Sequence, residues 1–168
     1  EIAQCLVGSE MCIRDRKAHP APDAPRPKVM LNTPYRDTWF MPARNSYMVR
    51  LLEDAGARYV FEENTATQTL PIDIEQAYYL TSKSDFWLNV SGCNTLDEVR
   101  RQNPRLADTP PVREGRVYDN NRRRNAAGGS DFWESGVLRP DRVLADLVHI
   151  FHPELSETDE LYYYRQLE

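Results

Sequence analysis

The segment KVMLNTPYRDTWFMPARNSYMVRLLEDAGARYVF, residues 28–61, decides the fold class. It begins with a short apolar run, residues 28–33, which ends at a proline and is typical of a buried strand. Within residues 45–57 apolar side chains recur at the spacing of an amphipathic helix, and residues 58–61 are again strand-like. The apolar positions of this helix are Met48, Leu51, Leu52 and Ala55. The segment therefore predicts a strand–helix–strand unit.

The alternation of strands and helices continues toward the C-terminus. Residues 85–90 and 115–120 have the apolar character of two further strands. The starts of three further helices are marked by Asp73 with Gln76, by Thr95 with Glu98, and by Pro140. Helices that connect successive strands in this way cover a parallel sheet. We therefore expect an α/β fold, a single lobe with a mostly parallel, four-stranded or larger sheet flanked by helices.

The composition fits one soluble domain and excludes several classes of protein. The chain has 168 residues, of which 40% are hydrophobic, and this is enough for one hydrophobic core. Its net charge of −5 argues against a nucleic-acid-binding protein, because such proteins carry a basic surplus. No apolar run approaches the roughly 18 residues that a membrane span needs. Cys93 is the only cysteine after residue 16, so we expect no disulfide within that part.

The residues that follow the predicted strands are candidates for a binding site. In an open parallel sheet, ligands bind beyond the carboxyl ends of the strands, where these loops meet. The loops cover residues 33–44, 62–70, 89–94 and 119–133. Two of them combine aromatic residues with arginine, a combination that suits a flat, partly anionic ligand. The first contains Tyr35, Trp39, Phe40 and Arg44, and the last contains Arg122, Arg123, Arg124, Phe132 and Trp133.

These loop residues also have plainer interpretations. Phe40 and Trp133 could cap the hydrophobic core beneath the loops instead of contacting a ligand. The three arginines at residues 122–124 are consistent with a solvated turn, an anion clamp or a nucleic-acid patch, and the acidic remainder of the chain disfavours the last. Trp87 lies within a predicted strand, so we expect its side chain in the core.

The sequence gives little support for an enzyme. It contains no Gly-x-Ser-x-Gly nucleophile elbow and no glycine-rich phosphate-binding pattern. His19 lies in the predicted linker, and His149 and His152 lie at the end of the last helix, far in sequence from the loops that follow the strands. Those loops therefore lack a residue that divalent-metal sites favour. We therefore expect no catalytic residue, no metal site and no resident cofactor.

Four segments of the chain, taken in order, carry a resemblance to a known family. They are residues 28–61, DFWLNV (85–90), GRVYDNNRRRNAAGGSDFWESGVLRPDRVLADLVHIFHPEL (115–155) and ELYYYRQLE (160–168). Together they resemble the C-terminal half of a periplasmic substrate-binding protein, of the helical-backbone class that serves ABC importers for iron chelates and cobalamin. The stretch at residues 129–147 is the most specific, and the resemblance spans residues 28–168.

The resemblance implies a binding function. Members of this family have two α/β lobes joined by a long helix, hold a ligand between the lobes, and deliver it to an ABC permease in the inner membrane. On this interpretation residues 28–168 are the second lobe, and the first lobe and the joining helix precede Lys28 in the full protein. The expected ligand is a ferric siderophore, haem or cobalamin. The expected location is the periplasm, with a lipid anchor on the full-length protein.

The resemblance also implies roles for individual residues. The loop after the first strand and the DFWE segment match the places where the family contacts its ligand. The expected ligand contacts are Tyr35, Trp39, Phe40, Arg44, Phe132 and Trp133, with Arg122 and Arg124 added on charge alone. Glu53 matches a glutamate on the lobe surface that pairs with permease arginines, although an ordinary solvated carboxylate is an equally good interpretation.

The N-terminal residues 1–27 do not look like part of a folded domain. The stretch CLVGSEMCIRDR (5–16) resembles a translated adapter of the kind used in sequencing libraries. Its cysteines are too far apart for a zinc knuckle, and its apolar run is too short for a secretory signal. Residues 17–27 are rich in proline, as in an extended linker. We interpret residues 1–27 as an artefact followed by a disordered linker, and the alternative is a genuine N-terminal arm.

Two other functions remain as alternatives. A cluster-binding oxidoreductase of related two-lobed architecture would need several cysteines at the lobe interface, and Cys93 alone is poor support. A stand-alone α/β interaction module without a small ligand would have no second lobe upstream. The natural sequence upstream of residue 17 would distinguish this module from a binding protein.

Overall fold

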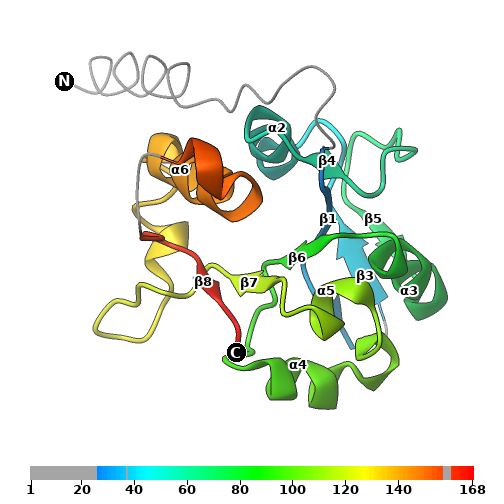
Figure 1. Ribbon diagram of the computed structural model, residues 1–168. Coiled ribbons are helices and arrows are strands. Elements are labelled where there is room, and N and C mark those ends of the chain that lie inside the picture. The colour runs from blue at the N-terminus through cyan, green and yellow to red at the C-terminus, as the bar shows by residue number, and fades with distance from the viewer. Residues whose placement is uncertain (1–25, 37, 157–159) are drawn as a thin grey trace.

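The computed structural model describes residues 26–36, 38–156 and 160–168 (Figure 1). The adapter-like stretch at residues 5–16 lies outside the described residues. Arg26 and Pro27, which we had placed in the linker, belong to the folded part. Arg26 donates from Nη2 to the carbonyl oxygen of Glu53 at 2.9 Å, and the carbonyl oxygen of Pro27 accepts the backbone N–H of Arg58 at 2.8 Å.

A five-stranded sheet lies at the centre of the molecule, in the order β4-β1-β6-β7-β8. Its strands are β1 (Lys28–Leu31), β4 (Arg58–Tyr59), β6 (Phe86–Leu88), β7 (Val117–Asp119) and β8 (Arg165–Gln166). The first four strands of this order run parallel, and β8 pairs antiparallel with β7 at the edge. This confirms the predicted α/β fold with a mostly parallel sheet.

Helices cover both faces of this sheet (Figure 1). One face carries α2 (Tyr47–Asp54) and α6 (Pro140–Phe151), and the other carries α3 (Ile74–Ser82), α4 (Leu96–Gln102) and α5 (Pro110–Arg113). Three 3-10 turns complete the described elements: η1 (Pro104–Leu106), η2 (Asp131–Trp133) and η3 (Pro153–Leu155). Among the described helices, none is long and apolar enough to cross a membrane.

The predicted helix starts are confirmed by their caps. Asp73 Oδ1 accepts the backbone N–H of Gln76 at 2.8 Å, and Thr95 Oγ1 accepts that of Glu98 at 3.2 Å. Each bond satisfies one of the N–H groups that a helix leaves unpaired in its first turn. Helix α6 begins at Pro140, where the missing N–H of proline costs the helix nothing.

A second, antiparallel sheet of three strands was not predicted from the sequence. It consists of β2 (Pro34–Tyr35), β3 (Thr38–Met41) and β5 (Leu70–Ile72), in the order β2-β3-β5. We had expected plain loops at residues 33–44 and 62–70. Such short strands show no alternation that a periodicity argument could detect, and their pairing depends on contacts distant in sequence. The hairpin β2–β3 therefore replaces most of the loop expected after β1.

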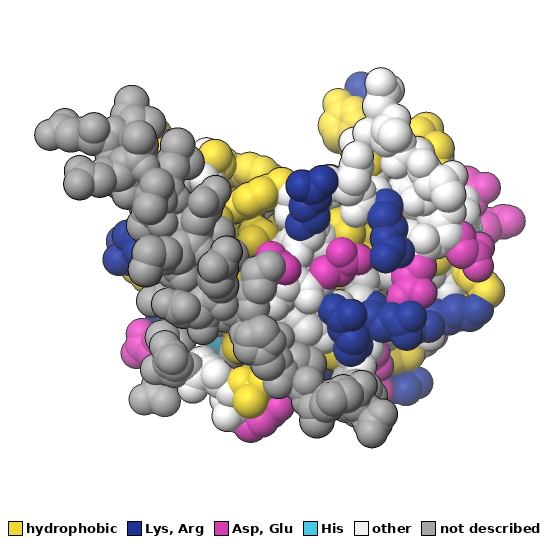
Figure 2. All heavy atoms as spheres, turned by 90° about the horizontal axis from the view of Figure 1, so that it is seen from above, with side chains coloured by type: hydrophobic (Ala, Val, Ile, Leu, Met, Phe, Trp, Pro, Cys, Tyr) yellow, Lys and Arg dark blue, Asp and Glu magenta, His cyan; other side chains and the backbone are white. Residues whose placement is uncertain are grey.

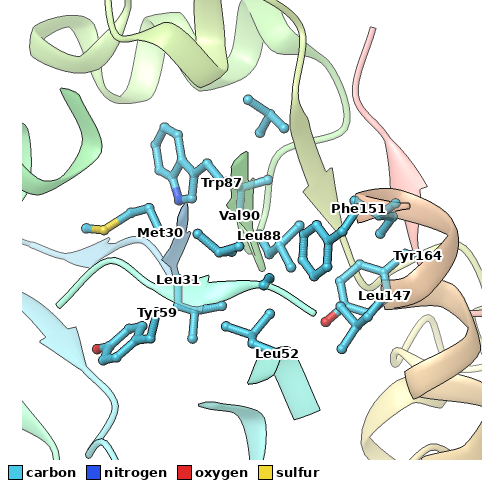
Figure 3. Close-up of a cluster of buried hydrophobic side chains, with 14 of the residues drawn as sticks. Met30, Leu31, Leu52, Tyr59, Trp87, Leu88, Val90, Leu147, Phe151 and Tyr164 are labelled. Atoms are coloured by element: carbon cyan, nitrogen blue, oxygen red, sulfur yellow. The ribbon is translucent and has the colours of Figure 1, made fainter. Parts of the chain in front are cut away.

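The core forms where the sheet meets α2 and α6 (Figure 3). Leu31 of β1 and Leu88 of β6 belong to one cluster with Leu52 of α2 and Phe151 of α6. Trp87 is fully buried, as predicted from its place in a strand.

The C-terminal segment is attached to α6 through one buried carboxylate. Asp146 accepts the backbone N–H groups of Tyr162, Tyr163 and Tyr164 at 2.7, 2.6 and 3.0 Å. These bonds bring the last residues back across α6 and lead the chain into β8. The three tyrosines thereby lie next to the segment that follows β7.

Candidate ligand-binding site

The strand order defines a switch point between β1 and β6. The chain leaves β1 through α2 and returns to the sheet at β4, on one side of β1. It leaves β6 through α4 and returns at β7, on the opposite side. The two connections therefore diverge just beyond the carboxyl ends of β1 and β6. In open α/β sheets this divergence opens the crevice in which ligands bind.

A hollow of about 360 Å³ lies at this switch point. Its lining combines the residues just after β1 and β6 with the start of α2 and the segment around η2. The lining residues are Asn32, Pro42, Ser46, Tyr47, Met48, Asn89, Phe132, Trp133, Gly136 and Val137. This lining is largely apolar and aromatic, and none of its residues is an acid or a base. The hollow therefore suits a flat or apolar ligand surface more than a charged one.

Two asparagines contribute side-chain amides to the lining. Asn32 and Asn89 directly follow β1 and β6, and both have a left-handed backbone, with φ of 66° and 61°. Asparagine adopts this conformation more readily than most residues. The backbone N–H of Asn32 donates to the carbonyl oxygen of Leu88 at 3.0 Å, which continues the pairing of β1 with β6. The two asparagines therefore lie side by side at the strand ends.

The Asn89 side chain is held by a buried network. Its Oδ1 accepts the hydroxyl hydrogen of Tyr164 at 2.9 Å and the Nδ2–H of Asn120 at 3.3 Å. Burial raises the pKa of Tyr164 well above its ordinary value, so its hydroxyl remains protonated and can donate. These two hydrogen bonds engage the oxygen of the Asn89 amide and fix the orientation of the side chain.

The aromatic wall is formed by the turn η2. Phe132 is buried against Tyr163 and Tyr164, with ring-centroid distances of 6.0 and 5.7 Å. The next ring, Trp133, stands edge-on to Phe132 at 5.0 Å but is 66% exposed. Gly136 allows this turn to close, because a Cβ there would clash with the carbonyl group of Phe132. Phe132 therefore anchors the wall, and Trp133 presents its ring at the hollow.

The first turn of α2 forms another part of the lining. Ser46 caps this helix, and the half-exposed ring of Tyr47 and the side chain of Met48 follow it. Burial is the main cause that raises the pKa of Tyr47, and the charge of Asp141 raises it further. Tyr47 and Met48 therefore line the hollow as neutral side chains.

The structure brings only two of the eight predicted ligand contacts to this hollow, Phe132 and Trp133. Trp39 requires a correction. It is 1% exposed, its ring lies 5.5 Å from that of Trp87, and its Nε1–H donates to the carbonyl oxygen of Leu31 at 2.9 Å. Its place in β3, rather than in a loop, turns the ring into the core. Trp39 is therefore a core residue.

Tyr35 and Phe40 are exposed but lie on the β2–β3 hairpin and do not line the hollow. Tyr35 is 67% exposed, and the guanidinium group of Arg36 lies 5.4 Å from its ring centre. A second hollow, of about 300 Å³, lies between this hairpin and η1 and includes the edge of Trp39. Because it is not at the switch point, we do not take it as the principal site.

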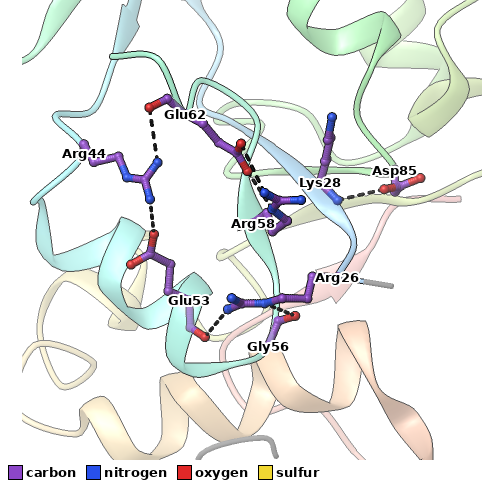
Figure 4. Close-up of polar contacts among 8 residues, drawn as sticks. All are labelled: Arg26, Lys28, Arg44, Glu53, Gly56, Arg58, Glu62 and Asp85. Atoms are coloured by element: carbon purple, nitrogen blue, oxygen red, sulfur yellow. Dashed lines mark hydrogen bonds and ion pairs between the residues drawn. The ribbon is translucent and has the colours of Figure 1, made fainter. Parts of the chain in front are cut away.

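Arg44 lies away from the hollow and is paired with Glu53, the residue expected to contact the permease (Figure 4). Arg44 Nη2 is 3.0 Å from Glu53 Oε1, and Arg44 Nη1 donates to the carbonyl oxygen of Glu62 at 3.2 Å. The nearby Arg58 pairs with the Glu62 carboxylate at 2.7 Å. Figure 2 likewise shows a face on which basic and acidic side chains stand next to one another. Arg44 therefore takes part in a mixed surface network.

Arg122 and Arg124 do not line the hollow either. Arg122 forms an ion pair with Glu160 at 3.1 Å. Arg124 Nη2 donates to Asn94 Oδ1 at 3.3 Å, and Arg165 Nη2 donates to the same oxygen at 2.7 Å. These contacts fit the alternative of a solvated turn better than an anion clamp.

The sequence analysis missed the asparagines and the first turn of α2 as lining residues. A signal for the asparagines is present: both KVMLN (28–32) and FWLN (86–89) are apolar strands followed directly by asparagine. Tyr47 and Met48 looked like ordinary helix residues, since their role depends on how α2 lies over the strand ends. Among the described residues, no group of three or more histidine, cysteine, aspartate and glutamate side chains could hold a metal ion.

Comparison with known proteins identifies the class of fold. The chain matches no protein-family model. It is 28% identical, over 131 residues, to an uncharacterized lipoprotein of Methanocaldococcus jannaschii, a match that covers 76% of this chain and 30% of the lipoprotein.

Solved structures of periplasmic binding proteins are similar to the chain. A TroA-like periplasmic binding protein, FepB, from Veillonella parvula has a TM-score of 0.63 at 14% identity and 99% coverage of this chain. An ABC transporter substrate-binding protein from Listeria monocytogenes has a TM-score of 0.64 at 16% identity and 90% coverage. A periplasmic heme binding protein from Pseudomonas aeruginosa has a TM-score of 0.59 at 20% identity and 99% coverage.

The chain therefore has the fold of one lobe of a periplasmic binding protein. It spans 55%, 57% and 55% of these three solved chains, about half of each. The proteins it resembles are described as binding proteins rather than enzymes, and the sequence relative is described as a lipoprotein.

Proposed function

We propose that the chain is the C-terminal lobe of a solute-binding protein that captures a metal chelate for an ABC importer. The observation that carries the proposal is the aromatic hollow at the switch point between β1 and β6. A hollow in this position, on a lobe with this fold, would contact one side of a ligand. A first lobe would contact the other side.

The lining favours a role in ligand binding over a role in catalysis. Trp133 and Tyr47 both line the hollow with partly exposed rings, and covering them with a ligand would remove apolar surface from water. The ligand classes we propose are a ferric siderophore, haem or cobalamin. The sequence analysis took arginine with aromatic residues as suited to a flat, partly anionic ligand, and no arginine lines the hollow. Flat chelates with apolar faces therefore fit it better.

Glu53 is the residue we propose for permease docking. It lies on α2, and Arg44 holds its carboxylate at the surface through an exposed ion pair. Arginines of a permease would have to compete with Arg44 for this carboxylate. We also propose a periplasmic location with a lipid anchor, supported by the descriptions of the similar proteins.

A titration tests the proposed function. The full-length two-lobed protein would be titrated with ferrichrome, hemin and cyanocobalamin, following the visible absorption of each chelate. We expect saturable binding of at least one chelate. The 168-residue chain alone should bind the same chelate much more weakly, because one lobe buries only one side of the ligand. Flat titrations of the two-lobed protein with all three chelates would contradict the proposal.

A further inference from the structure

The two strand-end asparagines, which line the hollow, leave opposite hydrogen-bonding groups unused. Asn32 donates from Nδ2 to the carbonyl oxygen of Phe40 at 3.1 Å, so its Nδ2 is engaged with the hairpin. In the part of the chain that the structure describes, no group donates a hydrogen bond to Asn32 Oδ1. Asn32 therefore offers an acceptor.

Asn89 is oriented the other way. Its Oδ1 is occupied by Tyr164 and Asn120, and no described residue accepts a hydrogen bond from its Nδ2. Asn89 is 6% exposed, and its Nδ2 is not among the described side-chain atoms that are fully buried without a partner, so a water molecule or a ligand acceptor can reach it. Asn89 therefore offers a donor.

We propose that Asn32 and Asn89 together bind a carboxamide group of the ligand, an inference that rests on the proposed function of the hollow. Asn89 Nδ2 donates to the carbonyl oxygen of the carboxamide, and Asn32 Oδ1 accepts from its N–H. Leu31 and Leu88 are paired in adjacent strands, so the asparagines that follow them lie next to each other. Neighbouring strands lie about 4.8 Å apart, so one small ligand group that carries a donor and an acceptor can reach both side chains.

The same arrangement disfavours a carboxylate. A carboxylate has no hydrogen to offer Asn32 Oδ1, and no cationic side chain lines the hollow to offset the loss of its hydration. A carboxamide carries the donor and the acceptor that the two asparagines need, whereas a carboxylate can pair only with Asn89 Nδ2. The pair should therefore distinguish a carboxamide from the carboxylate of the same shape.

Three small ligands that share a pyridine ring test this inference on the 168-residue chain. Nicotinamide carries a donor and an acceptor, 3-acetylpyridine carries only the acceptor, and nicotinate carries a carboxylate. Each would be titrated into ¹⁵N-labelled protein, following the side-chain amide signals of Asn32 and Asn89 by NMR. We expect nicotinamide to bind about fivefold or more tightly than either analogue and to shift both side-chain signals.

A pair of variants provides a check on the protein side. Asn89→Asp removes the donor and keeps an acceptor for Tyr164, and aspartate tolerates the left-handed backbone. It should weaken nicotinamide binding about fivefold or more. Asn45→Asp is the matched control, because it adds the same charge at an exposed residue outside the hollow. It should leave nicotinamide affinity unchanged.

The outcomes separate this inference from the proposed function. Equal affinity for the three ligands, or shifts that spare Asn32 and Asn89, would overturn the carboxamide assignment even if chelates bind to the two-lobed protein. A clear preference for nicotinamide would support the assignment even if all three chelate titrations are flat. The ligand series does not depend on any substitution, so a variant that fails to fold leaves the test intact.

Discussion

Arg44 Nη2 lies 3.0 Å from Glu53 Oε1, at the surface of α2 (Figure 4). The sequence analysis gave these residues separate roles, Arg44 toward the ligand and Glu53 toward the permease. The structure joins them in one ion pair, and a second bond from Arg44 to the carbonyl oxygen of Glu62 fixes the guanidinium group there. Arg44 is therefore a residue that orients Glu53 rather than a wall of the hollow.

The pair should contribute little to stability. Its side chains are 44% and 38% exposed, and exposed ion pairs are worth at most about 1 kcal/mol. We expect Arg44→Gln and Glu53→Gln each to change the free energy of unfolding by less than about 1 kcal/mol, as measured by urea denaturation. A loss of about 2 kcal/mol or more would show that the pair supports the fold. A small change would make either variant a clean probe of permease docking.

The α/β fold could be predicted because its determinants are local. Apolar strands such as residues 28–31, the caps at Asp73 and Thr95, and the proline at the start of α6 all appear in the sequence within a few residues. The antiparallel sheet could not be predicted in this way. Residues 70–72 pair with β3, which lies about thirty residues earlier, and only the folded chain brings them together.

The sequence predicted a binding site beyond the carboxyl ends of the strands, and the site residues stay a prediction. Phe132 and Trp133 follow β7 and reach the hollow, as the position of sites in open sheets suggests. Trp39 is buried because a hairpin forms where a loop was expected, and a hairpin alternates its side chains between two faces. Arg44 follows the hairpin, and its guanidinium group is paired with Glu53 at the surface. Asn89 was overlooked because its importance arises from its partners, not from its residue type.

Asp146 should be a major source of stability for the C-terminal segment. It is buried and accepts three backbone N–H groups, at 2.6 to 3.0 Å, from residues 162–164. Asp146→Ala would leave these groups unpaired, so we expect a loss of about 3 kcal/mol or more in the free energy of unfolding. Urea denaturation followed by circular dichroism measures it.

Two further variants make this test specific. Asp146→Asn keeps one acceptor oxygen and should lose less stability than Asp146→Ala. Asp97→Ala removes an exposed carboxylate from α4 and should cost about 1 kcal/mol or less. If Asp146→Ala and Asp97→Ala have equal effects, the three hydrogen bonds do not hold the segment in place.

Asp119, at the end of β7, should make stability depend on pH. Burial raises the pKa of this carboxyl above its ordinary value of 3.8, and this effect outweighs the opposing backbone N–H of Asn120 and the charges of Arg165 and Arg124. The unfolded chain therefore loses this proton at lower pH than the folded chain. Because the folded state then binds more protons, the contribution of Asp119 to stability falls as the pH rises above about 4.

Asp119→Asn removes this titration. The free energy of unfolding of the variant, minus that of the unchanged protein, should increase between about pH 4 and about pH 7. Urea denaturation at a series of pH values measures the difference, and Asp108→Asn, at an exposed position, controls for the change in net charge. A difference that is constant or decreases with pH would contradict the predicted direction.

Alanine substitutions of Phe132 and Trp133 should have different effects on stability and on ligand binding. Phe132 is 6% exposed and packs against two tyrosine rings, so Phe132→Ala should cost about 3 kcal/mol of stability. Trp133 is 66% exposed, so Trp133→Ala should cost less than about 1 kcal/mol while weakening nicotinamide binding severalfold. Phe40→Ala, which also removes an exposed ring but lies outside the hollow, should leave binding unchanged. Equal losses of nicotinamide affinity for Trp133→Ala and Phe40→Ala would show that the hollow is not the binding site.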